Sequence, residues 1–178
     1  SIIRALEHSS FINKVGIEII WIDEDLSMLD KVDGILVPGG FGQRGIENMI
    51  KASKYAREKN IPYFGICLGM QVLCIDIARN ILKMNDANST EFNKDTSNPI
   101  IIHQKDISVN KKGGNMRLGL QKVNIDIKSK VFQCYEKEII YERFRHRYIF
   151  NKKFLNLFED IMFVNKDVME LKNHSFCI

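Results

Sequence analysis

Hydrophobic and polar positions along the first half of the chain follow two alternating periods. Short apolar runs bounded by Gly and Pro predict buried strands over residues 17–22, 34–37 and 62–66. Helical spacing predicts the end of a helix over residues 1–10, and further helices over residues 45–59 and 70–81. In the last of these the apolar positions form one stripe: Met70, Leu73, Cys74, Ile77, Ala78 and Ile81. Strands that alternate with helices favour parallel βαβ units.

The second half of the chain has a different pattern. Residues 85–99 are polar and irregular, and Lys111 to Asn115 form a predicted turn or loop tip. Strand-like runs follow at residues 100–103, 123–127, 139–143 and 162–164, with one helical segment at residues 152–160. We therefore expect a three-layer α/β fold: a mostly parallel central sheet with flanking helices, extended by antiparallel strands.

Bulk composition narrows the class of protein. A length of 178 residues predicts a single domain over residues 1–178, and 45% hydrophobic with 27% charged residues is ordinary for a globular protein. The formal net charge of +4 is spread out, apart from Arg143, Arg145 and Arg147, so we expect no nucleic-acid partner. No apolar run approaches the roughly 20 residues that span a bilayer, so no membrane is expected.

The cysteines indicate a compartment. Cys67, Cys74, Cys134 and Cys177 show neither C-x-x-C spacing nor the density of a secreted disulfide scaffold. A reducing, cytoplasmic setting fits this usage. Because the chain starts at Ser1 and not at Met, we also expect it to be a piece of a longer polypeptide.

One segment carries candidate chemistry. Tyr63 to Gln71 runs from an apolar strand through Gly65-Ile66-Cys67-Leu68-Gly69 into a helix. This is the layout of a nucleophile elbow, in which paired glycines permit a strained turn and close strand–helix approach. The helix N-terminus aimed at Cys67 would favour the thiolate. The alternative is that Cys67 is a small buried hydrophobe.

A cysteine nucleophile also needs an oxyanion hole and a base. Residues 37–42 place three glycines after a strand, so the N–H of Gly40 and that of Leu68 could bind an oxyanion. The alternative for the glycine run is a tight turn; it lacks the residues of a phosphate-binding loop. None of His8, His103, His146 and His174 carries a local signature of a base, and each is interpreted as a surface or hydrogen-bonded histidine.

These motifs resemble the class I (triad) glutamine amidotransferases, whose fold is flavodoxin-like. Residues 38–42 and the Gly-Ile-Cys-Leu-Gly-Met-Gln segment carry the resemblance. The segments 88–92, 116–119 and 142–148 are similar to the glutaminase domains of the CTP synthase family, which usually shows a second His where Phe144 stands. The resemblance runs over essentially the whole chain.

The resemblance implies a role for each matching residue. Cys67 would attack the side-chain amide of L-glutamine, and Gly40 and Leu68 would stabilise the oxyanion. Glu91 suits the α-ammonium group and Arg147 suits the α-carboxylate. Arg145 and Arg117 would face the synthase domain and a GTP activator. The alternative for both is a solvated strand face, and Arg117 is the weaker candidate of the two. The remaining substrate-binding positions would be Phe41, Gly69, Met70 and Gln71.

The resemblance also implies partners. The full-length enzyme, a ligase of pyrimidine biosynthesis, would aminate UTP to CTP with ATP and Mg²⁺, using ammonia that passes through a tunnel. Those ligands would bind a synthase domain of the same polypeptide, which would assemble as a homotetramer. This domain itself would need no cofactor and no metal.

The ends of the chain depart from the family pattern. The family's His-Pro-Glu segment, which holds the other two triad residues, would begin roughly five residues after Ile178, and its first strand would precede Ser1. We therefore expect this polypeptide alone to hydrolyse glutamine poorly or not at all. Three other hypotheses for the function stay open: a glutaminase that serves another synthase, an unrelated cysteine hydrolase, and a non-catalytic regulatory module of the same fold.

Overall fold

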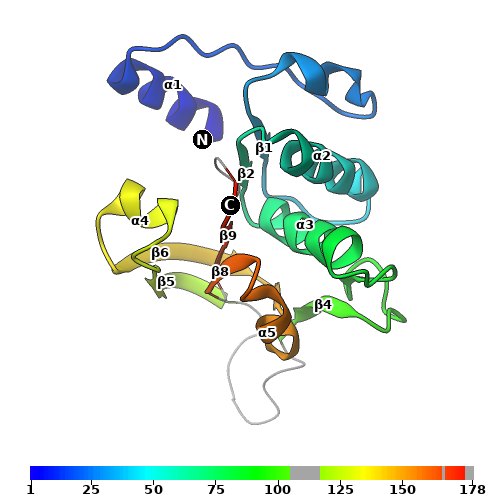
Figure 1. Cartoon of the computed structure of the whole chain (residues 1–178). Helices are drawn as coiled ribbons and strands as arrows, with labels where there is room; N and C mark the ends of the chain where they lie inside the picture. Colours follow the sequence, from blue (N-terminus) through cyan, green and yellow to red (C-terminus); the bar gives the residue numbers. More distant parts are fainter. Residues whose placement is uncertain (105–116, 166, 175–178) are drawn as a thin grey trace.

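The computed structural model describes residues 1–104, 117–165 and 167–174 (Figure 1). Its elements in chain order are α1 Ile2–Asn13, η1 Leu26–Lys31, β1 Ile35–Val37, α2 Ile46–Lys59, β2 Tyr63–Gly65, α3 Leu68–Asp76, the π-helical turn η2 Ile77–Ile81, β3 Asn88–Ser89, β4 Pro99–His103, β5 Arg117–Asn124, α4 Lys130–Tyr135, β6 Ile139–His146, β7 Tyr148–Phe150, η4 Lys152–Phe154, α5 Leu155–Phe158, β8 Met162–Asn165 and β9 Val168–Leu171.

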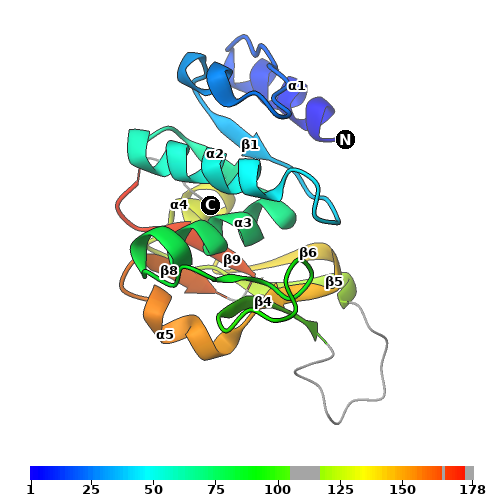
Figure 2. The same ribbon diagram turned by 90° about the vertical axis from the view of Figure 1, so that its right-hand side faces the viewer.

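A βαβα unit lies at the centre of the molecule. Strands β1 and β2 pair in parallel, with Ile35 opposite Tyr63, and helices α2 and α3 lie side by side next to them (Figures 1 and 2). Helix α2 is bounded by residues in the left-handed region, Gly45 at its start and Asn60 at its end. The predicted strand–helix alternation is confirmed here.

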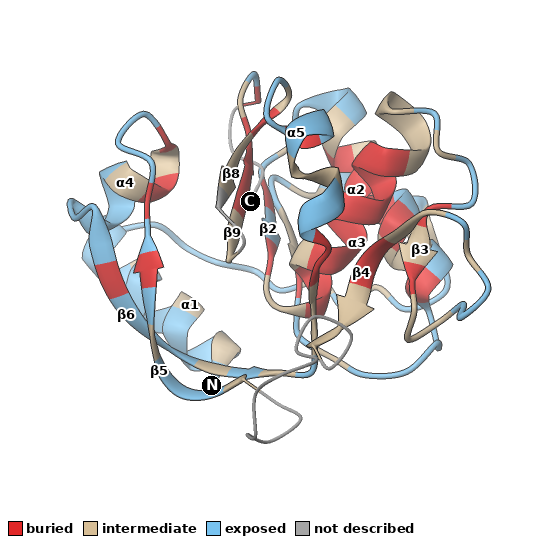
Figure 3. Ribbon diagram, turned by 90° about the horizontal axis from the view of Figure 1, so that it is seen from below, coloured by how far each residue is buried: buried red, intermediate tan, exposed pale blue. Residues whose placement is uncertain are grey.

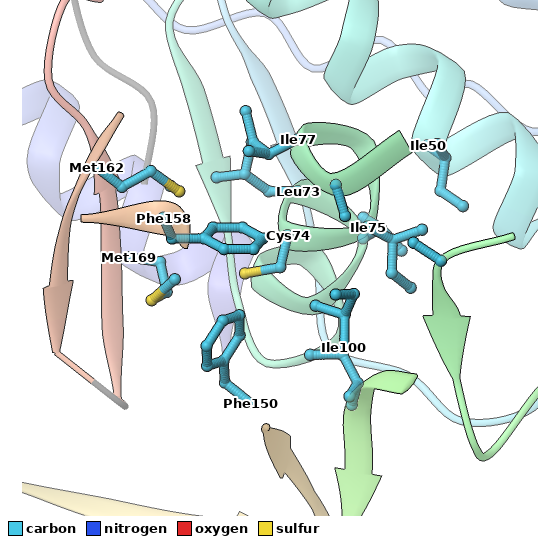
Figure 4. Close-up of a cluster of buried hydrophobic side chains, with 14 of the residues drawn as sticks. Ile50, Leu73, Cys74, Ile75, Ile77, Ile100, Phe150, Phe158, Met162 and Met169 are labelled. Atoms are coloured by element: carbon cyan, nitrogen blue, oxygen red, sulfur yellow. The ribbon is translucent and has the colours of Figure 1, made fainter. Parts of the chain in front are cut away.

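The largest apolar core surrounds α3. Leu73, Cys74 and Ile77 are fully buried, and they pack with Ile100, Phe150 and Phe158 from the second half of the chain (Figure 4). The predicted stripe on this helix is therefore the core-facing side, with its end residues Met70 and Ile81 half-buried. Figure 3 shows that burial concentrates on α2 and α3, whereas the β5–β6 ribbon is mostly exposed.

The second half contributes short sheets. Strand β4 pairs in parallel with β3 and antiparallel with β7, while β5 with β6 and β8 with β9 form separate antiparallel pairs. Among the described strands, then, only β1–β2 and β3–β4 are parallel. The antiparallel strands expected in the second half are confirmed, and the described strands form four separate short sheets.

The strand predicted over residues 17–22 is also absent. These residues have no regular structure in the chain as described, and Trp21 is 78% exposed. High β-propensity produces a strand only where a neighbouring strand supplies hydrogen bonds and a surface to pack against. Helix α1 before them likewise contains no buried residue, and it lies at the edge of the molecule in both ribbon views (Figures 1 and 2).

Several boundaries differ from the prediction. The strand expected at residues 123–127 is the later part of β5, which begins at Arg117, and the helix expected at residues 152–160 consists of η4 followed by the short α5. Helix α4 was not predicted, although Ser129 is a typical N-cap whose side chain accepts a bond from the Phe132 N–H. The predicted turn at Lys111 to Asn115 lies outside the described residues, as does Cys177.

In the described part of the chain, no helix is long and apolar enough to cross a membrane.

Candidate active site

Cys67 stands at a strained turn between β2 and α3. Its backbone has φ 57° and ψ −100°, a region that a residue with a side chain occupies only when the surrounding structure enforces it. The flanking glycines show what enforces it. A Cβ at Gly65 would lie 2.5 Å from the carbonyl carbon of Gly69, and a Cβ at Gly69 would lie 2.1 Å from the Val37 oxygen. The predicted elbow is confirmed, and both glycines are required by packing.

Hydrogen bonds fix the elbow against the strands beneath it. The Tyr63 hydroxyl donates to the Gly69 carbonyl oxygen at 2.8 Å, and the Ile66 N–H donates to the Val37 oxygen at 2.9 Å. Tyr63 is fully buried, so its hydroxyl bond is shielded from water. Tyr63 was not predicted as part of the site, because nothing local in the sequence distinguishes it from an ordinary strand residue.

The surroundings of the Cys67 thiol shift its pKa in both directions. Burial raises the pKa of Cys67, the backbone N–H of Leu68 lowers it, and the negative charge of Glu91 raises it further. The N–H at the helix start lowers the pKa in the predicted direction, but burial has the larger effect, so the pKa of Cys67 is raised overall. The Leu68 N–H is nevertheless close enough to the thiol to lower its pKa.

Two segments of the chain contact each other near Cys67. The oxyanion loop, residues 38–44, approaches Cys67: a Cβ at Gly39 would lie 3.4 Å from Cys67 Cβ, and one at Gly40 would lie 3.2 Å from Leu68 Cδ2. Farther along, the Gly42 N–H donates to Glu91 Oε1 at 3.2 Å. Glu91 belongs to the second segment, the Glu91 turn (residues 89–93), so this bond brings the predicted substrate carboxylate to the oxyanion loop.

Phe41 does not cover the site. Its side chain is 71% exposed. The neighbouring Gln43, which the sequence analysis did not single out, reaches the Glu91 turn and donates from Nε2 to the Phe92 oxygen at 2.7 Å. No sequence signal near Gln43 marks this contact, since its acceptor is 49 residues away.

Gln71 contacts β7 at Tyr148, the residue that follows Arg147 in the chain. Gln71 is buried on α3, and its Nε2 donates to the Tyr148 carbonyl oxygen at 3.4 Å. Arg147, immediately before Tyr148, is exposed, and its carbonyl oxygen accepts the Gln104 N–H at 2.8 Å. Met70, one residue before Gln71, is half-buried with its sulfur 3.5 Å from that of Cys74.

The two remaining arginines lie on the β5–β6 ribbon. Arg145 is exposed and opposite Leu118 in the register. Arg117 is only 13% exposed: it forms an ion pair with the nearly inaccessible Asp167, and its guanidinium lies 4.5 Å from the centre of the Phe144 ring. The structure thus groups Cys67, Gly40, Leu68, Gly69 and Glu91, and places Arg117 in a separate buried cluster.

Three of the four histidines contact other parts of the protein, and the fourth is exposed. His103 packs edge-on against Tyr148, and His146 packs edge-on against Phe144. His174 is buried with Nε2 3.1 Å from the Ala56 oxygen, and His8 is exposed on α1. None of them is among the groups that shift the Cys67 pKa. Among the described residues, no group of three or more His, Cys, Asp and Glu side chains is placed to hold a metal ion.

The elbow and its flanking loop match known proteins. Residues 1–177 match the glutamine amidotransferase class-I family. The chain is 46% identical over 191 aligned residues to the CTP synthase of Hydrogenobaculum sp., an alignment that covers 100% of this chain and 36% of that protein. It is 44% identical over 188 residues to the CTP synthase of Aquifex aeolicus, covering 98% of this chain and 35% of that protein.

A solved glutaminase domain has a similar structure to this chain. The glutaminase domain of Trypanosoma brucei CTPS with bound acivicin superposes with a TM-score of 0.84 at 35% identity, over 96% of this chain and 68% of that one. The chain spans about a third of the length of the curated relatives it matches. Together with the elbow at Cys67, these similarities show that the chain belongs to the class I glutamine amidotransferase family, with the α/β fold of that family, as a glutaminase domain of the CTP synthase type.

Proposed function

We propose that Cys67 attacks the side-chain amide carbon of L-glutamine. The thiol proton passes to a base, the C–N bond breaks, ammonia leaves, and water then hydrolyses the γ-glutamyl thioester to glutamate. The observation that carries the proposal is the strained Cys67 backbone at the start of α3, with the Leu68 N–H near the thiol whose pKa it lowers. Leu68 and Gly40 would donate to the oxyanion of the tetrahedral intermediate.

Glutamine would bind between the oxyanion loop and β7. Glu91 would accept the α-ammonium group, and the exposed guanidinium of Arg147 would pair with the α-carboxylate. Gln71 would help to position Arg147, because its hydrogen bond to the Tyr148 oxygen connects α3 to the residue next to Arg147. Phe41, Gly69 and Met70 would complete the walls around the aliphatic part of the substrate.

The nucleotide-dependent part of the reaction would take place outside this domain. ATP, Mg²⁺ and UTP would bind a synthase domain in the same polypeptide, to which ammonia would pass, and that polypeptide would form a homotetramer in the cytoplasm. The described residues offer no cluster suited to Mg²⁺. For a GTP activator or interdomain contact, Arg145 is the better candidate of the two arginines, because Arg117 is already paired with Asp167.

We also propose that the short sheets are parts of one three-layer architecture. The parallel β1–β2 pair next to α2 and α3 has the geometry of the centre of such a sheet.

A polypeptide limited to these 178 residues should turn glutamine over slowly or not at all. Its thiol has a raised pKa, and no described histidine is positioned to remove the proton. Turnover at the rate of a complete glutaminase by a chain of verified length would contradict this.

The decisive experiment is an intact mass with and without 6-diazo-5-oxo-norleucine, a glutamine-mimicking alkylator. A single adduct at Cys67, absent in Cys67→Ser and blocked by excess glutamine, is the expected result. An adduct on Cys134, or labelling that glutamine does not block, would count against a glutamine site. A protein with an intact mass above 20.7 kDa that contains the His-Pro-Glu segment and still takes no adduct would favour the non-catalytic module.

A further inference from the structure

We infer that Gln43 is a positioning residue of this glutaminase: its side-chain amide holds the oxyanion loop against the Glu91 turn while Glu91 binds substrate. The inference rests on the proposed function and adds a residue to it. Two hydrogen bonds join these segments, from the Gly42 N–H to Glu91 Oε1 at 3.2 Å and from Gln43 Nε2 to the Phe92 oxygen at 2.7 Å.

Hydrogen bonds have to fix this loop, because burial does not. Phe41, Gly42, Gln43 and Arg44 are all exposed, and Gly42 has φ +87°, which a flexible glycine adopts at little cost. The other contacts of this half of the loop are weaker: the Ile46 N–H donates to the Gln43 carbonyl oxygen at the long distance of 3.4 Å, and the Arg44–Asp23 pair is 3.9 Å long with both side chains more than 80% exposed. The two bonds to the Glu91 turn are therefore the main restraint on this half of the loop.

The two bonds respond differently to substrate. Glu91 is the proposed ligand of the α-ammonium group, and a charge-assisted bond to that group competes with the neutral Gly42 N–H for the carboxylate. The Gln43 bond ends on a main-chain oxygen and does not involve the Glu91 side chain. When the Glu91 carboxylate leaves the Gly42 N–H to bind the substrate, the Gln43 hydrogen bond still connects the two segments.

The consequence concerns the transition state. Gly40, whose N–H is a proposed oxyanion donor, is three residues before Gln43 in the same loop. A loop that drifts after substrate binding would misplace this donor when charge develops on the oxygen. Loss of the Gln43 bond should therefore lower kcat and leave KM for glutamine almost unchanged.

The test uses the complete protein that carries this chain. Gln43→Met keeps the side-chain length, adds no charge and removes the donor. Gln121→Met is the matched control, since Gln121 Nε2 also donates to a carbonyl oxygen, that of Leu118 at 3.1 Å, on the β5–β6 ribbon. Q43M should lower kcat by about three- to tenfold, the loss expected for one such bond, with KM within about twofold. Amide hydrogen exchange over residues 39–45 should be faster in Q43M and unchanged in Q121M.

The outcomes separate the inference from the function on which it rests. If the unsubstituted protein releases no ammonia from glutamine, the proposed function fails, and exchange alone decides whether Gln43 restrains the loop. If the protein is active but Q43M matches it in kcat and in exchange, the inference is wrong and the function stands. A rise in KM alone would also overturn it, because that would place Gln43 in substrate binding.

Discussion

Gly69 and Val37 touch so closely that no side chain fits between them: a Cβ at position 69 would lie 2.1 Å from the Val37 carbonyl oxygen and 3.0 Å from its carbon. The contact joins the first turn of α3 to the end of β1. It explains how a nine-residue helix can begin directly beside a buried strand and hold Cys67 above both.

Gly69→Ala should destabilise the fold severely. The added methyl group meets backbone atoms that cannot rotate away, so β1 and α3 must separate, at a cost of more than about 3 kcal/mol in the free energy of unfolding. Urea unfolding followed by circular dichroism measures the effect. Gly16→Ala is the control, since nothing lies within 4 Å of a Cβ there. Equal stability of the two variants would contradict the close contact.

The elbow was predictable from sequence because its determinants are local. Gly65, Cys67 and Gly69 lie within five residues, and the change from strand to helix pattern occurs between them. The loop contacts of Gln43 and the ion pair of Arg117 were not, because their partners are 49 and 50 residues away in the sequence. Pattern alone does not identify such partners.

The strand prediction for residues 17–22 was wrong for a related reason. Their β-branched composition indicates what a neighbouring strand would accept, but whether that neighbour exists is a property of the whole fold. The thiol pKa is a third case: the helix start was correctly placed, yet the extent of burial around Cys67, which decides the sign of the shift, depends on packing that the sequence does not display.

Asp76→Ala should cost about 3–5 kcal/mol of folding free energy. Asp76 is fully buried on α3 and accepts bonds from Arg57 Nε at 3.0 Å, Asn80 Nδ2 at 2.8 Å and Ser53 Oγ at 3.3 Å. Removing the carboxylate leaves the largely buried Arg57 guanidinium without its ion-pair partner on α3. Glu7→Ala, which breaks the solvent-exposed Arg4–Glu7 pair on α1, should change stability by less than about 1 kcal/mol in the same chemical denaturation series.

His146 should make the fold sensitive to mild acid. Burial and the nearby Arg117 lower the pKa of His146 below its usual 6.5, while Asp167 opposes the shift. The unfolded chain therefore binds the proton more readily, so stability is full above about pH 6.5 and is lost as the pH falls toward the folded-state pKa. His146→Gln should show a smaller fall in melting temperature between pH 7.5 and 5.5.

The control for this measurement is His8→Gln on the exposed α1, which should keep the full fall in melting temperature. If His146→Gln and the unsubstituted protein lose the same number of degrees over this pH range, the histidine environment described above does not govern acid stability.

The Cys67 thiol should react slowly at neutral pH. Because burial and Glu91 raise its pKa above the usual 9.0, the rate of alkylation by iodoacetamide should still be rising at pH 9, with no plateau between pH 7 and 8. Peptide mapping by mass spectrometry separates Cys67 from the exposed Cys134. Glu91→Gln removes one negative charge near the sulfur and should move the profile to lower pH, whereas Glu138→Gln, on the exposed surface before β6, should leave it in place. A plateau below pH 8 would contradict the raised pKa of Cys67. A profile that does not move in Glu91→Gln, or that moves to higher pH, would show that Glu91 does not act on this thiol, and would remove the electrostatic link between the nucleophile and the proposed substrate carboxylate.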